Sequence, residues 1–580
     1  MPPPPMAAVR HPYICLSCEL HSRRILPASP LRRALSISSR VLSSIAVNTS
    51  PRPPTAPKPT PDIKHIRENA AIYSQNCVDR NYHDLAQYPY EIQRLSAKSR
   101  ELQDALREPQ RKIKQIESSI AKLMTAYSNP HNADPEEKQK QKQTTKEELS
   151  TLRLSAQHLK EKSHHLATTR ANHTKEIDRL ALSLPNLTSP ETPPGSEPRL
   201  VNYINYDPNT PATLPTHTTS HVTIGTSLNL LNFTSASLTS GWGWYYLTNE
   251  AALLEQALIQ YALSVAIRRG WQAVSPPSLV YSHIAHACGF QPRDAHNEQQ
   301  IYLIEQSERD VARGKPGRCL AGTAEIPLAA MFAGQEIGGK GKGKGKGKGS
   351  ESQLPVKMVG VSRCFRAEAG ARGADTRGLY RVHEFTKVEL FGWAMPDSAS
   401  ETDGATTTPE GEGGSGGRAV TATTLFSEIL ELQTEILTAL NLPCRVLEMP
   451  AHDLGASAAR KRDIEVLFPS RMASHSSNLE NATNNATNND VDVESGWGEV
   501  TSASICTDYQ TRRLGTRLRS GNGGTGKFPH TVNGTAMAVP RIIAALLEHG
   551  WDEKRGFVVL PEVLRGWMGG RGVIGGKEES

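Results

Sequence analysis

Residues 359–393, VGVSRCFRAEAGARGADTRGLYRVHEFTKVELFGW, decide how the central part of this chain folds. The stretch begins and ends in strand-like runs, and a polar, glycine-rich segment separates them. This pattern predicts a β-hairpin with a long loop. The stretch also concentrates charge, because it contains five arginines and three glutamates: Arg363, Arg366, Arg372, Arg377 and Arg381, with Glu368, Glu384 and Glu389.

The arginines of this hairpin indicate a site for a polyanion. The planar guanidinium group suits phosphate or carboxylate, and it forms strong charge-assisted pairs with both. Surface salt bridges between the two strands are the alternative interpretation of the same residues. So many arginines beside a glycine-rich loop favour the polyanion.

Composition limits the classes of protein that remain. The chain has 580 residues, a net charge of +7 and a hydrophobic share of 37%, which excludes wholesale disorder. Its 45 glycines and 39 prolines predict long disordered stretches beside a folded body. No apolar run approaches the roughly 18 residues of a membrane span, so we expect no membrane contact. Eight cysteines are too few for a disulfide scaffold and indicate a reduced compartment.

The first part of the chain has the composition of a targeting signal. Residues 1–61 contain eight basic residues, many serines and one acid, Glu19. This pattern is typical of a mitochondrial transit peptide, and we assign residues 1–61 to a disordered transit peptide and linker. A disordered basic tail is the alternative. Cys15 and Cys18 form a lone CxxC with no second pair, so we expect no zinc.

Residues 62–185 are predicted to form a long helical hairpin. Apolar positions step by three and four residues from Ile92 to Leu123 and again from Leu149 to Leu184. A polar, turn-rich segment at 127–135 separates the two runs. This periodicity predicts an antiparallel coiled coil, with arms of about 50 Å and a kink at Pro109. Dimerisation or a spacer role is the commonest use of such a segment.

Residues 186–580 change to short apolar runs and amphipathic helices. Three low-complexity inserts, near 338–350, 396–418 and 474–489, interrupt them and are predicted to be surface loops between structural elements. Residues 521–527 match the start of a phosphate-binding P-loop. Phe528 stands where that motif needs serine or threonine, so we interpret the segment as a loop.

The segments FRAE and TRGLYRVHEFTKVE, at 365–368 and 376–389, closely resemble motif 2 of class II aminoacyl-tRNA synthetases in its seryl form. Other segments resemble that family in order and spacing: DIKHIRENAAIYSQN at 62–76, RRGWQAVSPPSLV at 268–280, GTAEIPLA at 322–329, DLGASAARKRDIEV at 453–466, GEVTSASICTDYQTRR at 498–513 and NGTAMAVPRIIAALLE at 533–548. The resemblance implies an α+β fold, an antiparallel class II sheet flanked by helices, with the N-terminal coiled-coil hairpin as a tRNA-binding arm.

The resemblance also implies the ATP site. Arg366 is expected to hold the α-phosphate and the serine carboxylate, and Arg541 the γ-phosphate; these two are the catalytic candidates. Phe385 is expected to stack on adenine, although a core role would explain it equally well. Glu499 and Ser502 are expected to coordinate Mg²⁺, which prefers such oxygen ligands. The full set of expected ATP contacts is Arg366, Ala367, Glu368, Val382, His383, Glu384, Phe385, Glu499, Val500, Thr501, Ser502 and Arg541.

The serine pocket follows from the same resemblance. Its expected residues are Thr323, Ala324, Glu325, Glu389 and Thr535, with Thr535 on the substrate hydroxyl. Pro540 departs from the small residue expected beside Arg541, and proline is tolerated where a helix starts.

The implied function is ATP-dependent activation of L-serine and transfer of the seryl group to the 3′ end of tRNA(Ser), by a homodimer in the mitochondrial matrix. ATP and Mg²⁺ are the expected small-molecule requirements. The alternatives are a catalytically inactive synthetase paralogue, a ligase that charges a carrier protein, and a coiled-coil interaction protein. The long arm counts against the carrier-protein ligase, and the retained Arg366, Glu499 and Arg541 count against the inactive paralogue. The motif-rich body counts against the coiled-coil interaction protein.

Overall fold

A computed structural model describes residues 52–128, 135–210, 217–290, 300–338, 354–367, 378–397, 420–476, 493–519 and 526–576. Nearly all of the predicted transit peptide lies outside these residues, and so do Glu368 and most of the three inserts. Within the described residues, no helix is long and apolar enough to cross a membrane. The described residues on the two sides of each insert belong to different elements, and α12 (Pro469–Ser476) includes residues 474–476 of the third predicted insert.

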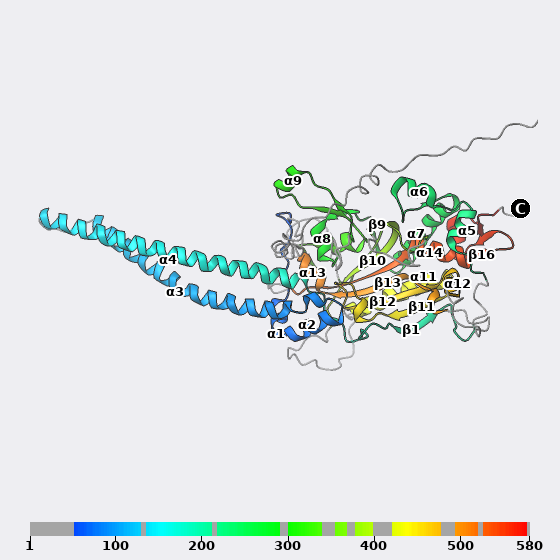
Figure 1. Ribbon diagram of the computed structural model, residues 1–580, viewed down its shortest axis with the longest axis horizontal. Coiled ribbons are helices and arrows are strands. Elements are labelled where there is room, and N and C mark those ends of the chain that lie inside the picture. Colours follow the sequence, from blue (N-terminus) through cyan, green and yellow to red (C-terminus); the bar gives the residue numbers. More distant parts are fainter. Residues whose placement is uncertain are drawn as a thin grey trace, which may run out of the picture. The chain divides into compact units, whose positions relative to one another are not determined.

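The described strands include one eight-stranded sheet (Figure 1). Its neighbours pair antiparallel, except that β4 runs parallel to β9. The predicted hairpin forms its strands β9 and β10, with Phe365 opposite Glu384. In order across the sheet the strands are β1 (Arg199–Ile204), β11 (Cys444–Glu448), β12 (Arg460–Leu467), β13 (Trp497–Thr507), β15 (His530–Ala538), β10 (Glu384–Ala394), β9 (Val356–Phe365) and β4 (Gln272–Val274).

Three helices cover one face of this sheet: α7 (Asn249–Arg268), α11 (Ala422–Ala439) and α14 (Val539–His549). Their apolar stripes and every second side chain of the strands form the largest core, which includes Val388 and Leu390 of β10. Because strand side chains alternate, the residues between them point to the other face. That alternation leaves one face of β10 free to line a site.

Short elements cover part of the second face. They are α8 (Ser282–Ala287), α10 (Glu325–Ala329), α13 (Tyr509–Leu514) and the small sheet of β5 (Leu279–Tyr281), β6 (Leu303–Ile304) and β7 (Arg318–Leu320). A second core forms here around Phe391 and Trp393 of β10, with Ile326 and Leu328 of α10. The helices α10 and α13 therefore rest directly on the sheet, beside the site-facing residues.

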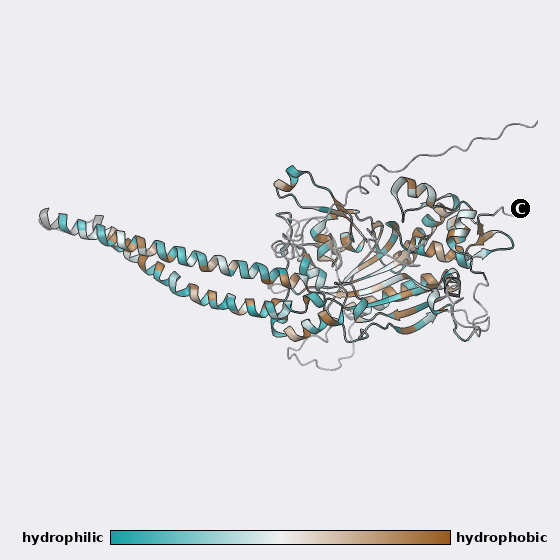
Figure 2. Cartoon of the chain, in the orientation of Figure 1, coloured by the Kyte–Doolittle hydropathy of each residue, from teal (hydrophilic) through white to brown (hydrophobic). Residues whose placement is uncertain are grey.

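The predicted helical hairpin is present as α3 (Tyr88–Ser128) and α4 (Pro135–Ser183), which pack side by side (Figure 1). Lys160 pairs with Glu117 at 2.9 Å, and Arg153 contacts Met124, so the helices run antiparallel. At 41 and 49 residues the helices span about 60 and 75 Å, longer than the predicted 50 Å. The helix α3 continues through Pro109. Hydrophilic residues predominate along both helices (Figure 2).

The base of the hairpin is anchored to the sheet. The helices α1 (Ile63–Glu68) and α2 (Ala70–Asp79) pack on the hairpin in a separate apolar core. Arg80, only 1% exposed, donates to the carbonyls of Asn186 and Gly455. The Asn186 amide in turn donates to the carbonyls of Ser457 and Cys506, both at 2.9 Å.

The remaining described elements are short: η2 (His83–Leu85), α5 (His221–Ser227), β2 (Leu231–Asn232), α6 (Phe233–Ser240), β3 (Tyr246–Leu247), α9 (Glu308–Ala312), η4 (Ala330–Phe332), β8 (Glu336–Ile337), η7 (Ala451–Asp453), α12 (Pro469–Ser476), η9 (Glu494–Gly496), β14 (Arg517–Leu518), β16 (Trp551–Asp552), β17 (Phe557–Val559), α15 (Glu562–Arg565), η10 (Gly566–Met568) and β18 (Val573–Ile574).

Candidate active site

The hairpin supplies the first wall of a pocket. Because Val388 and Leu390 point into the core, Phe385, Lys387 and Glu389 point to the opposite face of β10. Arg366 follows the last residue of β9, and its guanidinium carbon lies 5.1 Å from the centre of the Phe385 ring. This cation–π distance fixes the arginine beside an aromatic surface that is 9% exposed.

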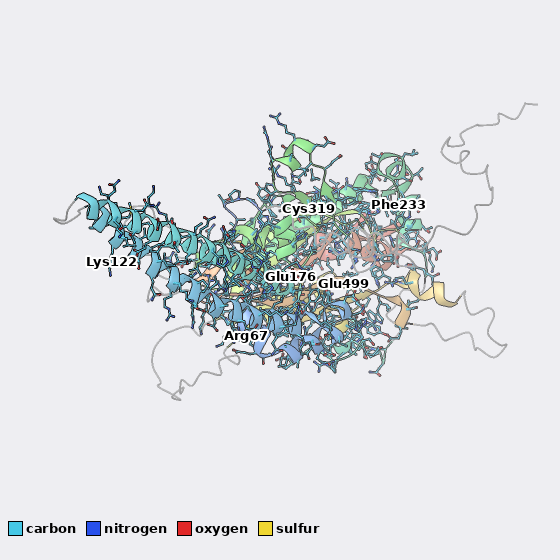
Figure 3. All side chains as sticks on the ribbon, turned by 60° about the vertical axis from the view of Figure 1, so that its left-hand side comes forward. Arg67, Lys122, Glu176, Phe233, Cys319 and Glu499 are labelled. Atoms are coloured by element: carbon cyan, nitrogen blue, oxygen red, sulfur yellow. The ribbon has the colours of Figure 1, made fainter. Side chains whose placement is uncertain are left out.

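A bulge in β13 supplies the second wall. Opposite β12, Thr501 pairs with Ile464 and Glu499 pairs with Glu465, so Val500 is an extra residue. In a regular strand, side chains three residues apart face opposite sides of the sheet. The bulge re-aims them, so Glu499 and Ser502 line one pocket while the Val500 side chain joins the core. Figure 3 shows Glu499 among the side chains of the body.

Arg541 closes the pocket from the start of α14. Its Nη1 donates to the Glu499 carbonyl at 2.7 Å and lies 3.2 Å from the Glu499 carboxylate, and its Nε donates to the Tyr380 carbonyl at 3.0 Å. Pro540 is the second residue of α14, so this proline is accommodated at a helix start as predicted. Burial would raise the pKa of the Glu499 carboxyl, but Lys461, Arg541 and Arg366 outweigh burial and lower it.

One pocket thus collects side chains from three segments that lie far apart in the sequence, within residues 366–387, 499–502 and 535–541. Its lining includes most of the predicted ATP contacts together with Thr535 from the predicted serine set: Arg366, Val382, Phe385, Glu499, Val500, Thr501, Ser502, Thr535 and Arg541. The lining also contains Leu379, Tyr380, Arg381, Lys387, Ala538 and Pro540. Glu368 lies outside the described residues, and its predicted contact with ATP stays a prediction.

A second group of buried polar residues adjoins this pocket at the start of α10. Thr323 and Ala324 are buried, and Thr323 Oγ1 accepts a hydrogen bond from the Glu325 N–H at 3.3 Å. Across the sheet, Glu389 of β10 lies directly opposite Thr535 of β15. The predicted serine residues therefore converge from three elements.

The two carboxylates of this group, Glu325 and Glu389, are buried, and they lie close enough for their charges to interact. Glu389 is 1% exposed and pairs with Lys387 at 2.6 Å. Burial raises the pKa of Glu325 to about 8, and the nearby Glu389 adds to that rise, whereas Lys387 opposes it. At neutral pH this group therefore holds less negative charge than two free carboxylates would.

Three predicted ATP residues, Ala367, His383 and Glu384, are not part of the lining of the described pocket. Glu384 faces the helix-covered side of β10 and pairs with Arg363 at 2.8 Å. His383 Nδ1 lies 3.1 Å from the Tyr302 hydroxyl and 3.0 Å from the Arg366 carbonyl. His383 thus supports Arg366 from behind, and its own contact with ATP stays a prediction, as does that of Ala367.

Sequence reasoning missed several residues that shape the site. Gln510 of α13 donates to Glu325 Oε1 at 2.6 Å, and Asn533 of β15 donates to Glu325 Oε2 at 3.1 Å. Both residues belong to segments that resemble the family. Gln510 is 185 residues and Asn533 is 208 residues from Glu325 along the chain, so no sequence pattern indicated these contacts. Lys387 could have been predicted from the sequence, since it stands two residues from both Phe385 and Glu389 and so shares their face of the strand.

A buried ion pair on β12 was also missed. Lys461 and Asp463 are bonded at 2.7 Å, and Asp463 lies opposite Ser502 of β13. The Asp463 Oδ1 atom is buried without a hydrogen-bond partner among the described residues.

The antiparallel sheet, the arginine that follows the first strand of its hairpin and the second arginine at the start of α14 define a class II aminoacyl-tRNA synthetase. The family profile described as tRNA synthetase class II core domain (G, H, P, S and T) matches residues 323–408 and 418–550. The mitochondrial serine–tRNA ligase of Saccharomyces cerevisiae is 36% identical over 521 residues, which cover 89% of this chain and 96% of that protein. The chain belongs to the serine–tRNA ligase family.

Two further proteins support this family assignment. The mitochondrial serine–tRNA ligase of Schizosaccharomyces pombe is 35% identical over 504 residues, which cover 87% of each chain. The crystal structure of seryl-tRNA synthetase from Pyrococcus horikoshii complexed with ATP superposes with a TM-score of 0.65 at 26% identity. That match covers 88% of this chain and 99% of the archaeal one.

Proposed function

We propose that this chain activates L-serine with ATP to give seryl-adenylate and pyrophosphate, and then transfers the seryl group to the 3′ end of tRNA(Ser) in the mitochondrial matrix. The observation that carries the proposal is the single pocket in which Arg366, Arg541 and Thr535 meet. The archaeal relative is described with ATP, which supports ATP as the substrate of this pocket.

The first step is attack of the serine carboxylate on the α-phosphorus, with pyrophosphate as the leaving group. Arg366 lies beside the Phe385 ring in the pocket that Thr535 also lines, where it neutralises charge on the carboxylate and the α-phosphate. Arg541 offers its guanidinium group to the leaving phosphates. Catalysis here is positioning and electrostatic stabilisation, since no residue forms a covalent bond with the substrate.

The donor set fits Mg²⁺ as a companion of ATP. Glu499 and Ser502 share one wall and offer hard oxygen atoms, and an ion of this kind takes its other ligands from phosphates and water. Asp463 Oδ1, opposite Ser502, is a further buried oxygen without a hydrogen-bond partner among the described residues, and it would add negative charge near such an ion. When bound, Mg²⁺ would neutralise phosphate charge.

Serine recognition is assigned to the buried group around Glu325 and Glu389. The serine ammonium group would meet these carboxylates, and its hydroxyl would meet Thr535. A pocket whose polar groups need a substrate hydroxyl rejects alanine strongly, because those groups are otherwise left unpaired.

Serine-dependent ATP–pyrophosphate exchange tests the proposal on the full chain, with alanine, threonine and cysteine as competing substrates. Exchange with serine, together with charging of tRNA(Ser), supports both steps. A folded protein without exchange for any amino acid would instead favour the inactive paralogue.

Binding of serine beside Glu325 is expected to release close to one proton per site at pH 7. With a pKa of about 8, the Glu325 carboxyl is mostly protonated at that pH, and the serine ammonium group favours the ionised form. The release should shrink as the pH rises above about 8, because the carboxylate is then ionised before binding. Calorimetry at pH 7 in two buffers of different ionisation enthalpy measures the proton count.

The variant Glu325→Gln provides the control for this measurement, since it keeps the shape of the side chain and cannot release a proton. Equal binding enthalpies in both buffers for the unchanged chain would contradict the protonated state of Glu325.

The mitochondrial assignment rests on residues 1–61 and on relatives that are named mitochondrial. Fusion of residues 1–61 to a fluorescent protein should direct it to mitochondria, and a cytosolic signal would count against the assignment. A homodimer is supported by exposed apolar side chains within and around residues 268–280, the segment RRGWQAVSPPSLV, among them Leu253, Ile267, Leu279, Tyr281, Leu303 and Ile304. Sedimentation at micromolar concentration should give twice the chain mass.

A further inference from the structure

Residues 52–60, here termed the N-terminal strap, pack on the body instead of acting as a free linker. Ala56 N–H donates to the Pro53 carbonyl at 2.9 Å, which forms a turn, and Thr60 N–H donates to the Arg512 carbonyl at 2.9 Å. Proline-rich composition suggested a linker, but prolines also lose little entropy when an extended segment docks. The strap meets α13 at Thr60, two residues before Asp62. The Asp62 carboxylate accepts a hydrogen bond from the His65 N–H at 2.9 Å and pairs with Arg512 at 3.1 Å.

Pro57 is the centre of this contact. It lies against Gly334 and Gly515, two glycines with φ of +71° and +67°. Gly334 follows η4, and Gly515 is the C-cap of α13. A Cβ atom at Gly515 would come within 2.8 Å of the Pro57 Cβ, so the glycine allows the close approach. The two glycine segments are themselves joined, since Gly334 N–H donates to the Leu514 carbonyl at 2.9 Å. The strap therefore covers the seam between the α10–η4 segment and α13.

The far end of the strap is close to α8. Arg52 is half-buried. The pKa of His283 in α8 is lowered to about 4, mainly by the burial of His283 and also by the nearby charge of Arg52. The helices α8 and α13 pack on each other and both pack on α10. The strap thus contacts α13 and lies near α8, the two helices that pack on α10 at the start of the serine pocket.

The line of contacts from the strap to the pocket is short. Thr60 bonds Arg512, which lies in α13 two residues after Gln510, and Gln510 donates to Glu325 at 2.6 Å. The Gln510 amide is fixed from its other side by Thr531, whose Oγ1 donates to Gln510 Oε1 at 2.7 Å. A small shift of α13 would lengthen the Glu325 contact without moving Arg366 or Arg541.

We propose that the N-terminal strap positions Gln510 through α13 and thereby sets the affinity of the enzyme for serine, with little effect on ATP. The proposal rests on the serine pocket assigned under the proposed function. It makes the strap and Gln510 positioning elements, which act on the substrate through Glu325.

Full-length variants in the serine-dependent exchange assay test this. Pro57→Ala removes the central contact, and replacement of residues 53–60 by a glycine–serine repeat of equal length removes the whole strap. Both should raise the KM for serine, by about threefold and about tenfold respectively, and leave the KM for ATP within about twofold. Pro54→Ala is the matched control, because Pro54 is exposed in the same segment.

A double-mutant comparison separates positioning from general loss of stability. Gln510→Ala alone should raise the KM for serine, and combining it with the strap replacement should add less than the two effects separately, since both act through one contact. Loss of folded protein would instead lower kcat with both KM values unchanged. An unmoved serine KM, equal shifts for serine and ATP, or full additivity would each overturn the strap proposal alone. Absence of exchange in the unchanged chain would overturn the proposed function, and the strap proposal with it.

Discussion

Replacing Arg366 by alanine is expected to lower kcat/KM for serine-dependent ATP–pyrophosphate exchange by about 10²- to 10³-fold. The guanidinium group lies over Phe385 at 5.1 Å and lines the same pocket as Glu499 and Thr535. In adenylation two anions, a carboxylate and a phosphate, must approach each other. Loss of the cation between them therefore raises the barrier far more than it weakens the binding of either substrate.

Arg363→Ala is the matched control for this prediction. Arg363 belongs to the same hairpin, but its Nε donates to Glu384 at 2.8 Å and its Nη1 to Thr386 at 2.9 Å on the helix-covered side of the sheet. It is 47% exposed, and such surface pairs contribute less than about 1 kcal/mol. Exchange should fall by less than about threefold, and thermal stability should change little. Similar losses for both variants would show that Arg366 acts on the fold of the hairpin, not on the reacting groups.

The hairpin could be predicted from sequence because its information is local. Alternating residues gave the two strands, and the same alternation explains why Phe385, Lys387 and Glu389 share a face. The bulge in β13 could not be predicted in this way. Regular alternation would place Glu499 and Ser502 on opposite faces of the sheet. Only the resemblance to the family predicted that they share one site. The extra residue Val500 makes that arrangement possible.

The contacts that finish the serine pocket are non-local, and this is why residue patterns missed them. Gln510 and Asn533 reach Glu325 from α13 and β15, and their motifs carry no hint of that target. The docking of the N-terminal strap was missed for a related reason. Composition describes the tendency of a segment to be ordered alone, whereas Pro57 is held by glycines at 334 and 515.

The arm was predicted in kind but not in length. The helix α4 begins at Pro135, well before the first apolar position used in the prediction, Leu149. Between them the sequence is rich in lysine, glutamine and glutamate, which are strong helix formers without an apolar stripe. Periodicity therefore identified the packed part of the hairpin and overlooked the hydrophilic part.

Deletion of residues 107–170 is expected to reduce charging of tRNA(Ser) by at least about 10³-fold while serine-dependent exchange stays within about twofold. The pairs Glu117–Lys160 and Met124–Arg153 both have residue numbers that add up to 277, which places position 107 opposite position 170. A short glycine-rich turn between Leu106 and Ala171 therefore closes the shortened hairpin. The loss corresponds to about 4 kcal/mol, which three charge-assisted contacts to phosphate would supply.

Exchange is preserved in this variant because the base of the hairpin remains. The apolar core around Ile92, Leu95, Ile177 and Leu180 lies outside the deletion, and Arg80 still holds Asn186 and Gly455. Changing the exposed Lys140, Lys142 and Lys146 to glutamine should give a smaller, salt-sensitive loss of charging, because these lysines would contact phosphate only. If deletion abolished exchange together with charging, the arm would be part of the structural support of the catalytic body. If charging survived the deletion, RNA recognition would have to reside in the body itself, and the two long helices would need another partner.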